Sequence, residues 1–220
     1  MSDEDRGTAS PICYAAEFEP GHVDPEQARD VARWRKAERL RLRGERDALS
    51  VTERAAKGAE IGGHLLRFLM ARFGTLKGRV FSGYWPIKGE PDLRPALAEL
   101  HRAGVLVALP LVEVKAAPLV FRRWTPETRM VRGDWSIPVP PPEAEAVVPE
   151  IALAPVMGWT VDRFRLGYGG GYFDRTLAAL APRPFTIGIG LQSARLATIF
   201  PQPHDIPLDA ILTEDGVQAG

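Results

Sequence analysis

Residues 165–175 read Arg-Leu-Gly-Tyr-Gly-Gly-Gly-Tyr-Phe-Asp-Arg, and four glycines fall within five consecutive positions. Glycine permits a positive φ and lets backbone N–H groups approach an anion closely. Successive bare N–H groups form an anion-binding concavity, and a helix that begins near Tyr172 would add the partial positive charge of its N-terminus. Arg165 and Arg175 can neutralise phosphate, and Asp174 can bind a divalent cation. The segment predicts a phosphate-binding loop, with a tight turn before a helix, without any ligand, as the alternative.

Two common phosphate-binding loops do not match this segment. The dinucleotide-binding pattern G-x-G-x-x-G, started at Gly167, would require glycine at the position of Tyr172. The Walker A pattern ends in Gly-Lys-Ser/Thr, and those residues do not follow the loop. The kind of ligand must therefore be inferred from the rest of the chain.

Short apolar runs alternate with helical runs around this loop. The apolar runs have the composition of buried parallel strands, and two helical runs begin with caps, at Asp24-Pro25 and at the Ser50-x-x-Glu53 capping box. The alternation predicts an α/β fold, a single three-layer domain with a mostly parallel sheet that binds ligands beyond the carboxyl ends of its strands. We expect strands within 79–85, 105–112, 151–157 and 185–191, and helices over 25–47, 50–73, 91–103 and 172–180.

The chain of 220 residues is long enough for this domain. Residues 1–24 are polar and irregular and are expected to form an N-terminal extension to a domain that spans 25–220. The proline-rich stretch 125–149 is expected to be a loop or a covering flap.

Composition indicates the compartment and excludes some partners. Lys plus Arg and Asp plus Glu both total 28, and a net charge of zero argues against general nucleic-acid binding. No apolar run approaches the length of a membrane span, and the acidic N-terminus does not resemble a secretory signal. The single cysteine, Cys13, cannot form an internal disulfide and fits a reducing cytoplasm. We expect a cytoplasmic protein with no nucleic-acid or membrane partner.

Three further groups of residues are candidates for ligand contacts. Tyr84, Trp85 and Glu90 follow a predicted strand and could stack and hydrogen-bond a flat polar ligand, or simply form a turn into the next helix. Arg35 and Arg39 share one helix face and could bind a polyphosphate or form an ordinary solvated face.

The third group lies near the C-terminus. His204-Asp205-Ile206-Pro207-Leu208-Asp209 places a carboxylate at Asp205, which with Asp174 could offer a second hard-oxygen ligand for Mg²⁺. A turn with a capping aspartate is the alternative.

Together these motifs resemble the 5-formyltetrahydrofolate cyclo-ligase (methenyltetrahydrofolate synthetase) family over residues 35–214. The family's R-L-G-x-G-x-G-Y-[YF]-D pattern appears at 165–174, its Y-x-P-x-x-G-E-x-D pattern at 84–92, its Trp-x-Ile-Pro-x-Pro element at 135–140 and its closing H-D-x-P-L-D-x-x-x-T-E at 204–214. Its N-terminal K-x-x-x-R pair resembles Arg35 and Arg39. The combination is specific, whereas no single motif is.

The resemblance implies a fold like that of the NagB/RpiA/CoA-transferase group. It also implies an ATP- and Mg²⁺-dependent reaction that converts 5-formyltetrahydrofolate to 5,10-methenyltetrahydrofolate through a phosphorylated formyl intermediate, with release of ADP and phosphate. The protein is expected to be a monomer or a weak homodimer whose partners are the folate and ATP.

The resemblance also implies roles for individual residues. Tyr172 and Arg165 are expected to be catalytic, and Asp174 and Asp205 to hold Mg²⁺. ATP is expected to contact Arg35, Arg39, Arg165, Leu166, Gly167, Tyr168, Gly169, Gly170, Gly171, Tyr172 and Phe173. The folate is expected to contact Tyr84, Trp85, Glu90, Trp135, Tyr168, Gly169, Gly170, Gly171 and Tyr172.

The chain departs from the family pattern at three positions. Thr160 and Arg163 stand where the family commonly has aspartate and a turn glycine, and Val139 stands where many members have glutamate. Arginine at a turn glycine is unfavourable if φ is positive there. The departures leave two alternatives open: a divergent paralogue that binds nucleotide or folate without turnover, or an ATP-dependent enzyme acting on another pterin-like heterocycle.

Overall fold

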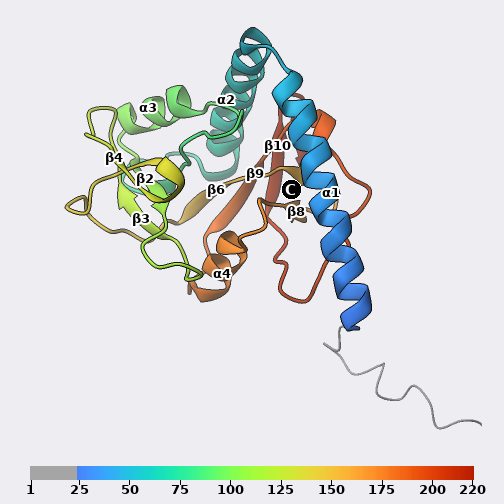
Figure 1. Cartoon of the computed structure of the whole chain (residues 1–220). Coiled ribbons are helices and arrows are strands. Elements are labelled where there is room, and N and C mark those ends of the chain that lie inside the picture. The colour runs from blue at the N-terminus through green and yellow to red at the C-terminus, as the bar shows by residue number, and fades with distance from the viewer. Residues whose placement is uncertain (1–23) are drawn as a thin grey trace, which may run out of the picture.

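The computed structural model describes residues 24–220, which form one α/β domain around a seven-stranded sheet (Figure 1). Most of the predicted N-terminal extension, including Cys13, lies outside the described residues. The strand order is β11-β10-β9-β6-β1-β2-β3. These strands are β1 (Val80–Ser82), β2 (Leu106–Leu111), β3 (Val120–Arg123), β6 (Ile151–Pro155), β9 (Phe185–Ile189), β10 (Ala210–Thr213) and β11 (Gly216–Ala219).

The five central strands run parallel, as expected for a mostly parallel sheet, and β3 and β11 add antiparallel edges. Four of the parallel strands fall within the predicted ranges, whereas β10 was not predicted. Two small hairpins stand outside this sheet. They pair β4 (Val131–Arg132) with β5 (Pro138–Val139), and β7 (Gly158–Trp159) with β8 (Arg165–Leu166). The proline-rich stretch therefore contains a short hairpin as well as loop.

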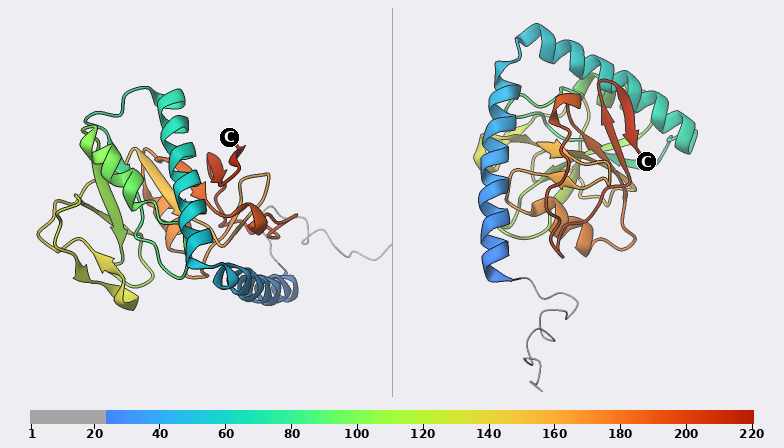
Figure 2. Two further views of the ribbon diagram at one scale, coloured as in Figure 1. Left: turned by 90° about the horizontal axis from the view of Figure 1, so that it is seen from above. Right: turned by 90° about the vertical axis from the view of Figure 1, so that its right-hand side faces the viewer.

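The four α-helices confirm the helical predictions to within a few residues. Asp24 caps the first helix by accepting a hydrogen bond from the Glu26 N–H, and Ser50 and Glu53 form the predicted capping box of the second. Extended backbone at Leu49 and Ser50 separates these two long helices, which meet at a sharp bend (Figure 2). The helices are α1 (Pro25–Ala48), α2 (Val51–Phe73), α3 (Arg94–Arg102) and α4 (Tyr172–Ala179).

Helices cover both faces of the sheet. Neighbouring residues of β6 therefore point into two different cores. Leu153 packs into a core with side chains from α2 and α3, whereas Ala154 packs into a second core with Leu42 of α1 and Leu177 of α4. The predicted three-layer arrangement is confirmed. Within residues 24–220, no helix combines the length and the apolar character needed to cross a membrane.

The strand order reverses between β1 and β6. From β1 the chain builds outward through β2 and β3, then returns to place β6 on the other side of β1 and continues to β9 and β10. A crevice forms at such a reversal, beyond the carboxyl ends of the strands, and is where open α/β sheets bind ligands. The segments that leave β1 and β6 carry Glu90 and the glycine loop, respectively, so the topology brings these two motifs together.

Candidate functional site

The glycine loop spans 167–171, between β8 and α4. Gly169 and Gly171 have φ values of 97° and 64°, which favour glycine, and Gly171 caps α4 without a side-chain hydrogen bond. Among the described residues, the N–H groups of Gly169, Gly170 and Gly171 donate no hydrogen bond. Unused amides at a helix N-terminus form an anion-binding surface.

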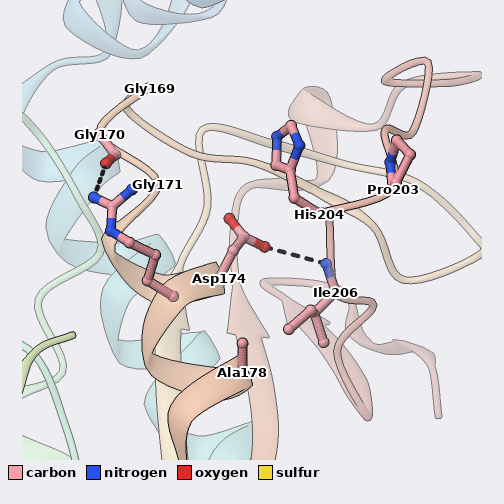
Figure 3. A pocket seen from close by; sticks show the side chains of 9 residues that line it. Gly169, Gly170, Gly171, Asp174, Ala178, Pro203, His204 and Ile206 are labelled. Carbon is pink, nitrogen blue, oxygen red and sulfur yellow. Dashed lines mark hydrogen bonds between the residues drawn. The ribbon is translucent and has the colours of Figure 1, made fainter. Parts of the chain in front are cut away.

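A cavity of about 460 Å³ opens beside this loop (Figure 3). Its other walls come from α4, through Asp174 and Arg175, and from the loop that precedes β10, through His204 and Ile206. This loop is called the C-terminal loop below. The side chain of Asp174 points toward the C-terminal loop, where it accepts a hydrogen bond of 3.2 Å from the Ile206 N–H. The cavity is large enough to hold a group the size of a phosphate chain, and it is lined by the loop glycines and a carboxylate.

An ion pair closes the base of the glycine loop. Nη2 of Arg165 lies 2.7 Å from Oδ2 of Asp174, and the Arg165 guanidinium stacks 5.0 Å from the centre of the Phe173 ring. Arg165 is buried, and burial lowers its pKa while the Asp174 carboxylate opposes that shift. Arg165 is not among the residues that line the cavity, so its role at the loop is the support it gives through Asp174.

A second buried ion pair joins α1 to the C-terminal loop. Arg35 donates to both carboxylate oxygens of Asp205, and its Nε donates to the Ile199 carbonyl over 2.9 Å. Burial opposes ionisation of Asp205, but the hydrogen bonds from Arg35 and from the Gln202 N–H outweigh it and lower the pKa of Asp205. In this structure Arg35 is bound to Asp205 and is not among the residues that line the cavity.

Arg39, one turn along α1, reaches the glycine loop itself. Its Nε donates a hydrogen bond of 2.7 Å to the Gly167 carbonyl, and its guanidinium lies next to Gly169. Burial and the neighbouring charge of Arg35 lower the pKa of Arg39. Of the two arginines that the sequence predicts, Arg39 is the one in contact with the loop.

On the opposite side of the loop, Tyr168 joins Glu90. The Tyr168 hydroxyl donates a hydrogen bond of 2.6 Å to Oε1 of Glu90 and accepts one of 3.0 Å from Arg46. Glu90 is only 7% exposed, and burial raises the pKa of its carboxyl group. Tyr84 is buried and donates to the Pro91 carbonyl, so it supports this turn from inside. The predicted folate-contacting motif and the glycine loop are therefore in direct contact.

Aromatic side chains border the loop at its helical end. The rings of Trp135 and Tyr172 meet edge to face with centroids 5.7 Å apart, and Trp135 is 68% exposed. In the segment that follows β1, the Arg94 guanidinium lies 4.9 Å from the ring centre of Trp85. Trp135 and Tyr172 thus form an open apolar wall that a ring system could cover.

The Mg²⁺ prediction fits one of its two carboxylates better than the other. Mg²⁺ is usually bound through one or two carboxylates plus substrate phosphates, and Asp174 stands at the cavity beside the loop amides. Both carboxylates already have partners: Asp205 accepts hydrogen bonds from Arg35, whereas Asp174 pairs with Arg165 and accepts a hydrogen bond from the Ile206 N–H. The difference is that Asp174 lines the cavity and Asp205 does not. Residues 24–220 contain no group of three metal-ligating side chains. The donor set fits a metal held largely by the nucleotide, with Asp174 as the protein ligand.

The sequence analysis did not identify Arg46, and it did not place Arg175 or His204 among the expected ligand contacts. Arg175 lines the cavity, stacks 5.0 Å from the Tyr172 ring centre and donates to the Gly170 carbonyl. Arg46 is buried, and it continues the face of α1 that carries Arg35, Arg39 and Leu42. The spacing of four, three and four residues in this series was the available signal for Arg46.

The departures from the family pattern do not disrupt the local structure. Arg163 has φ of 66°, as expected for a position that favours glycine, and its Nε donates to the Leu208 carbonyl over 3.1 Å. The Thr160 hydroxyl accepts a hydrogen bond of 3.2 Å from the Phe164 N–H within the same turn. Val139 is buried in β5. The turn that carries two of the departures is thus intact.

Comparison with known proteins identifies relatives over most of the chain. The sequence model described as the 5-formyltetrahydrofolate cyclo-ligase family matches residues 31–214. The 5-formyltetrahydrofolate cyclo-ligase of Mycolicibacterium smegmatis is 30% identical over 146 residues, which cover 63% of this chain and 75% of that protein. The Escherichia coli K12 protein of the same name is 29% identical over 135 residues, covering 59% of this chain and 74% of the relative.

Solved structures support the same relationship. The 5,10-methenyltetrahydrofolate synthetase of Aquifex aeolicus superimposes with a TM-score of 0.68 at 26% identity, covering 83% of this chain and 91% of that one. The 5,10-methenyltetrahydrofolate synthetase of Mycoplasma pneumoniae has a TM-score of 0.67 at 23% identity, covering 82% of this chain and 98% of that one, and this likeness concerns the fold alone.

Proposed function

The chain belongs to the 5-formyltetrahydrofolate cyclo-ligase family and is an enzyme of that class; we propose that it makes 5,10-methenyltetrahydrofolate from 5-formyltetrahydrofolate with ATP and Mg²⁺. The formyl oxygen attacks the γ-phosphorus of ATP and ADP leaves. Nitrogen 10 then attacks the activated formyl carbon and loses its proton, and phosphate departs with the former formyl oxygen. The substrate supplies both nucleophiles, so the protein's task is positioning and charge neutralisation.

The observation that carries the proposal is the contact between the two predicted subsites. The glycine loop offers unused amides to a cavity on one side, and on the other its Tyr168 touches Glu90 at the exit of β1. Phosphoryl transfer to the folate requires the γ-phosphate and the formyl group to lie within reacting distance. A loop that borders both subsites meets that requirement.

The protein's residues then have separate tasks. The loop amides and Arg175 hold the phosphates, and Arg39 fixes the loop from α1. The Glu90 carboxylate accepts hydrogen bonds from the pterin, and Trp135 with Tyr172 forms the apolar wall beside it. Mg²⁺, held by Asp174 and the nucleotide, would neutralise charge on the phosphates. Arg165 acts through Asp174, because it is buried behind the loop.

The test is the growth of the methenyltetrahydrofolate absorbance band with purified protein, MgATP and 5-formyltetrahydrofolate. Growth that requires ATP is expected, and omission of ATP or of Mg²⁺ should abolish it. Separate titrations of ATP and of the folate form the second arm. A folded protein that binds ATP but not the folate, with no growth of the band, would overturn the proposal in favour of another heterocyclic substrate.

Cytoplasmic location, a monomeric or weakly dimeric state and the absence of nucleic-acid or membrane partners remain predictions from the sequence. Sedimentation of the purified protein over a range of concentrations would test the oligomeric state.

A further inference from the structure

A buried chain of hydrogen bonds runs from α1 to the turn after β1. Nη2 of Arg46 donates to the Val156 carbonyl over 2.8 Å, and Nη1 donates to the Tyr168 hydroxyl over 3.0 Å. The same hydroxyl donates to Oε1 of Glu90 over 2.6 Å, and the Ile87 N–H donates to Oε2 over 2.9 Å. This chain of hydrogen bonds therefore connects α1, the exit of β6, the glycine loop and the exit of β1.

The direction of every hydrogen bond in this chain follows from the groups. A guanidinium can only donate, so the Tyr168 oxygen must accept from Arg46. The single phenolic proton is then free to point at Glu90, which accepts it best as a carboxylate. The positive charge of Arg46 polarises the Tyr168 hydroxyl group, which strengthens the hydrogen bond that this hydroxyl donates to Glu90.

The other charged and titratable groups around Glu90 do not replace this chain. Lys88 lies over the Tyr168 ring, with Nζ 5.4 Å from its centre, and makes no hydrogen bond to Glu90. Tyr84 donates to the Pro91 carbonyl, and Asp92 is paired with Arg94. Among the described residues, the Tyr168 hydroxyl is the only side-chain group that donates to Glu90. Loss of that hydroxyl would leave a buried carboxylate with one backbone donor, and burial favours its protonation.

The remaining acceptor capacity of Glu90 matches a pair of donors. A carboxylate offers about four lone-pair positions, and the Tyr168 hydroxyl and the Ile87 N–H each use one, on different oxygens. One position on each oxygen is left, which is the number that two adjacent N–H groups of a heterocycle require. Only the ionised carboxylate can accept at both.

We propose that Tyr168 is a positioning residue that, together with Arg46, keeps Glu90 ionised and oriented for the pterin ring of the folate substrate. This inference rests on the proposed function, because it gives Glu90 a folate ligand. Tyr168 occupies a variable position of the glycine-loop pattern, so its role follows from the contacts in this structure. The residue is 38% exposed, so part of Tyr168 remains accessible to a ligand.

The first experiment measures Glu90 directly, without any ligand. The Glu90 carboxyl carbon is followed by NMR against pH in protein labelled at glutamate, and Glu90→Gln identifies its signal. Tyr168→Phe keeps the ring and removes only the hydroxyl group. We expect the Glu90 titration midpoint to rise by about one pH unit in this variant, a tenfold change in proton affinity.

Two further variants keep this measurement interpretable. Arg46→Gln should raise the midpoint as well, because it removes the charge at the start of the chain. Tyr172→Phe removes a second tyrosine hydroxyl, at the start of α4 directly after the loop, which accepts a hydrogen bond of 3.4 Å from the Ala116 N–H. This variant should leave the Glu90 midpoint unchanged. An unchanged or lowered midpoint in Tyr168→Phe would overturn the proposal. An equal rise in Tyr172→Phe would also overturn it, because a general disturbance of the loop would then explain the shift.

The second experiment measures binding of 5-formyltetrahydrofolate and of ATP from pH 5.5 to pH 8. In Tyr168→Phe we expect folate affinity to fall about tenfold at the acidic end and less at the alkaline end, with ATP affinity within about twofold of the wild type. A pH-independent loss of folate affinity would contradict the inference. If the midpoint rises but the wild-type protein binds no folate, the proposed function fails while the control of Glu90 by Tyr168 stands.

Discussion

Arg165 and Asp174 lie at the two ends of the glycine loop, and their side chains meet at 2.7 Å. The pair joins β8 to the first turn of α4, so it fixes the two ends of the glycine loop relative to each other. Asp174 consequently has two tasks: it supports the loop through Arg165, and it presents a carboxylate to the cavity. Experiments on this residue must separate the two.

Two substitutions at Asp174 make that separation. Asp174→Ala leaves Arg165 buried without its partner and should reduce the free energy of unfolding by about 3 kcal/mol. Asp174→Asn keeps a hydrogen-bond acceptor for Arg165 and should destabilise the protein less, yet it should raise the Mg²⁺ concentration needed for half-maximal turnover more than tenfold. Urea denaturation and Mg²⁺ titration of the reaction measure the two effects. Normal Mg²⁺ dependence in Asp174→Asn would remove Asp174 as the metal ligand.

Asp205 is predicted to act on ATP through Arg35 rather than on the metal. Arg35 donates to both of its oxygens, so Asp205→Asn should loosen Arg35 and the C-terminal loop that borders the cavity. We expect a several-fold loss of ATP affinity with an unchanged Mg²⁺ requirement at saturating ATP. A shift in the Mg²⁺ requirement as large as that in Asp174→Asn would instead support the original two-aspartate metal site.

Substitution of Gly169 tests whether the loop needs its positive φ. Its φ of 97° is a conformation that alanine rarely adopts, and a Cβ there would meet the Arg39 guanidinium at 3.4 Å. Gly169→Ala should cost about 1–2 kcal/mol of stability and should weaken ATP binding because the loop amides would shift. The control is Gly167→Ala, where a Cβ meets no heavy atom within 4 Å, and whose unfolding free energy should change by less than about 0.5 kcal/mol. Equal destabilisation of the two variants would contradict the argument.

Arg163 permits a measurement of backbone strain in this particular chain. Its φ is 66°, and its Nε bonds the Leu208 carbonyl. Arg163→Ala removes the hydrogen bond and keeps the strain, whereas Arg163→Gly removes both. The glycine variant should therefore unfold with a free energy about 1 kcal/mol higher than the alanine variant, as measured by urea denaturation. An alanine variant at least as stable as the glycine variant would show that the turn tolerates a side chain without strain.

Glu90 should make stability depend on pH in an identifiable direction. Burial raises the pKa of its carboxyl group above the value in the unfolded chain. Between these two pKa values the folded protein binds more protons than the unfolded chain, so the contribution of Glu90 to stability falls as pH rises. Glu90→Gln removes this term, and its stability relative to wild type should increase between about pH 4 and pH 7. Denaturation curves at both pH values test this; a constant difference would show that Glu90 does not titrate in that range.

Local patterns in the sequence were sufficient for the four α-helices and for four of the five parallel strands. They also predict that the glycine loop binds phosphate. The capping box at Ser50 and the apolar runs that became β1, β2, β6 and β9 depend on neighbouring residues and on burial, and both leave a periodic trace in the chain. The antiparallel edge strands β3 and β11 and the small hairpins were missed, because short edge strands lack the continuous apolar run of a central strand. The parallel strand β10, which has only four residues, was missed as well.

The partners of the charged side chains were decided only by the tertiary structure. The sequence assigned both Asp174 and Asp205 to one metal, but the fold pairs each with its own arginine, and Arg35 and Asp205 come from positions 170 residues apart. Tyr168 and Glu90 meet because the strand order reverses between β6 and β1, and nothing near either residue indicates that contact. Helical and strand periodicity is a local property, whereas an ion pair or a buried hydrogen bond depends on which distant segments the sheet places side by side.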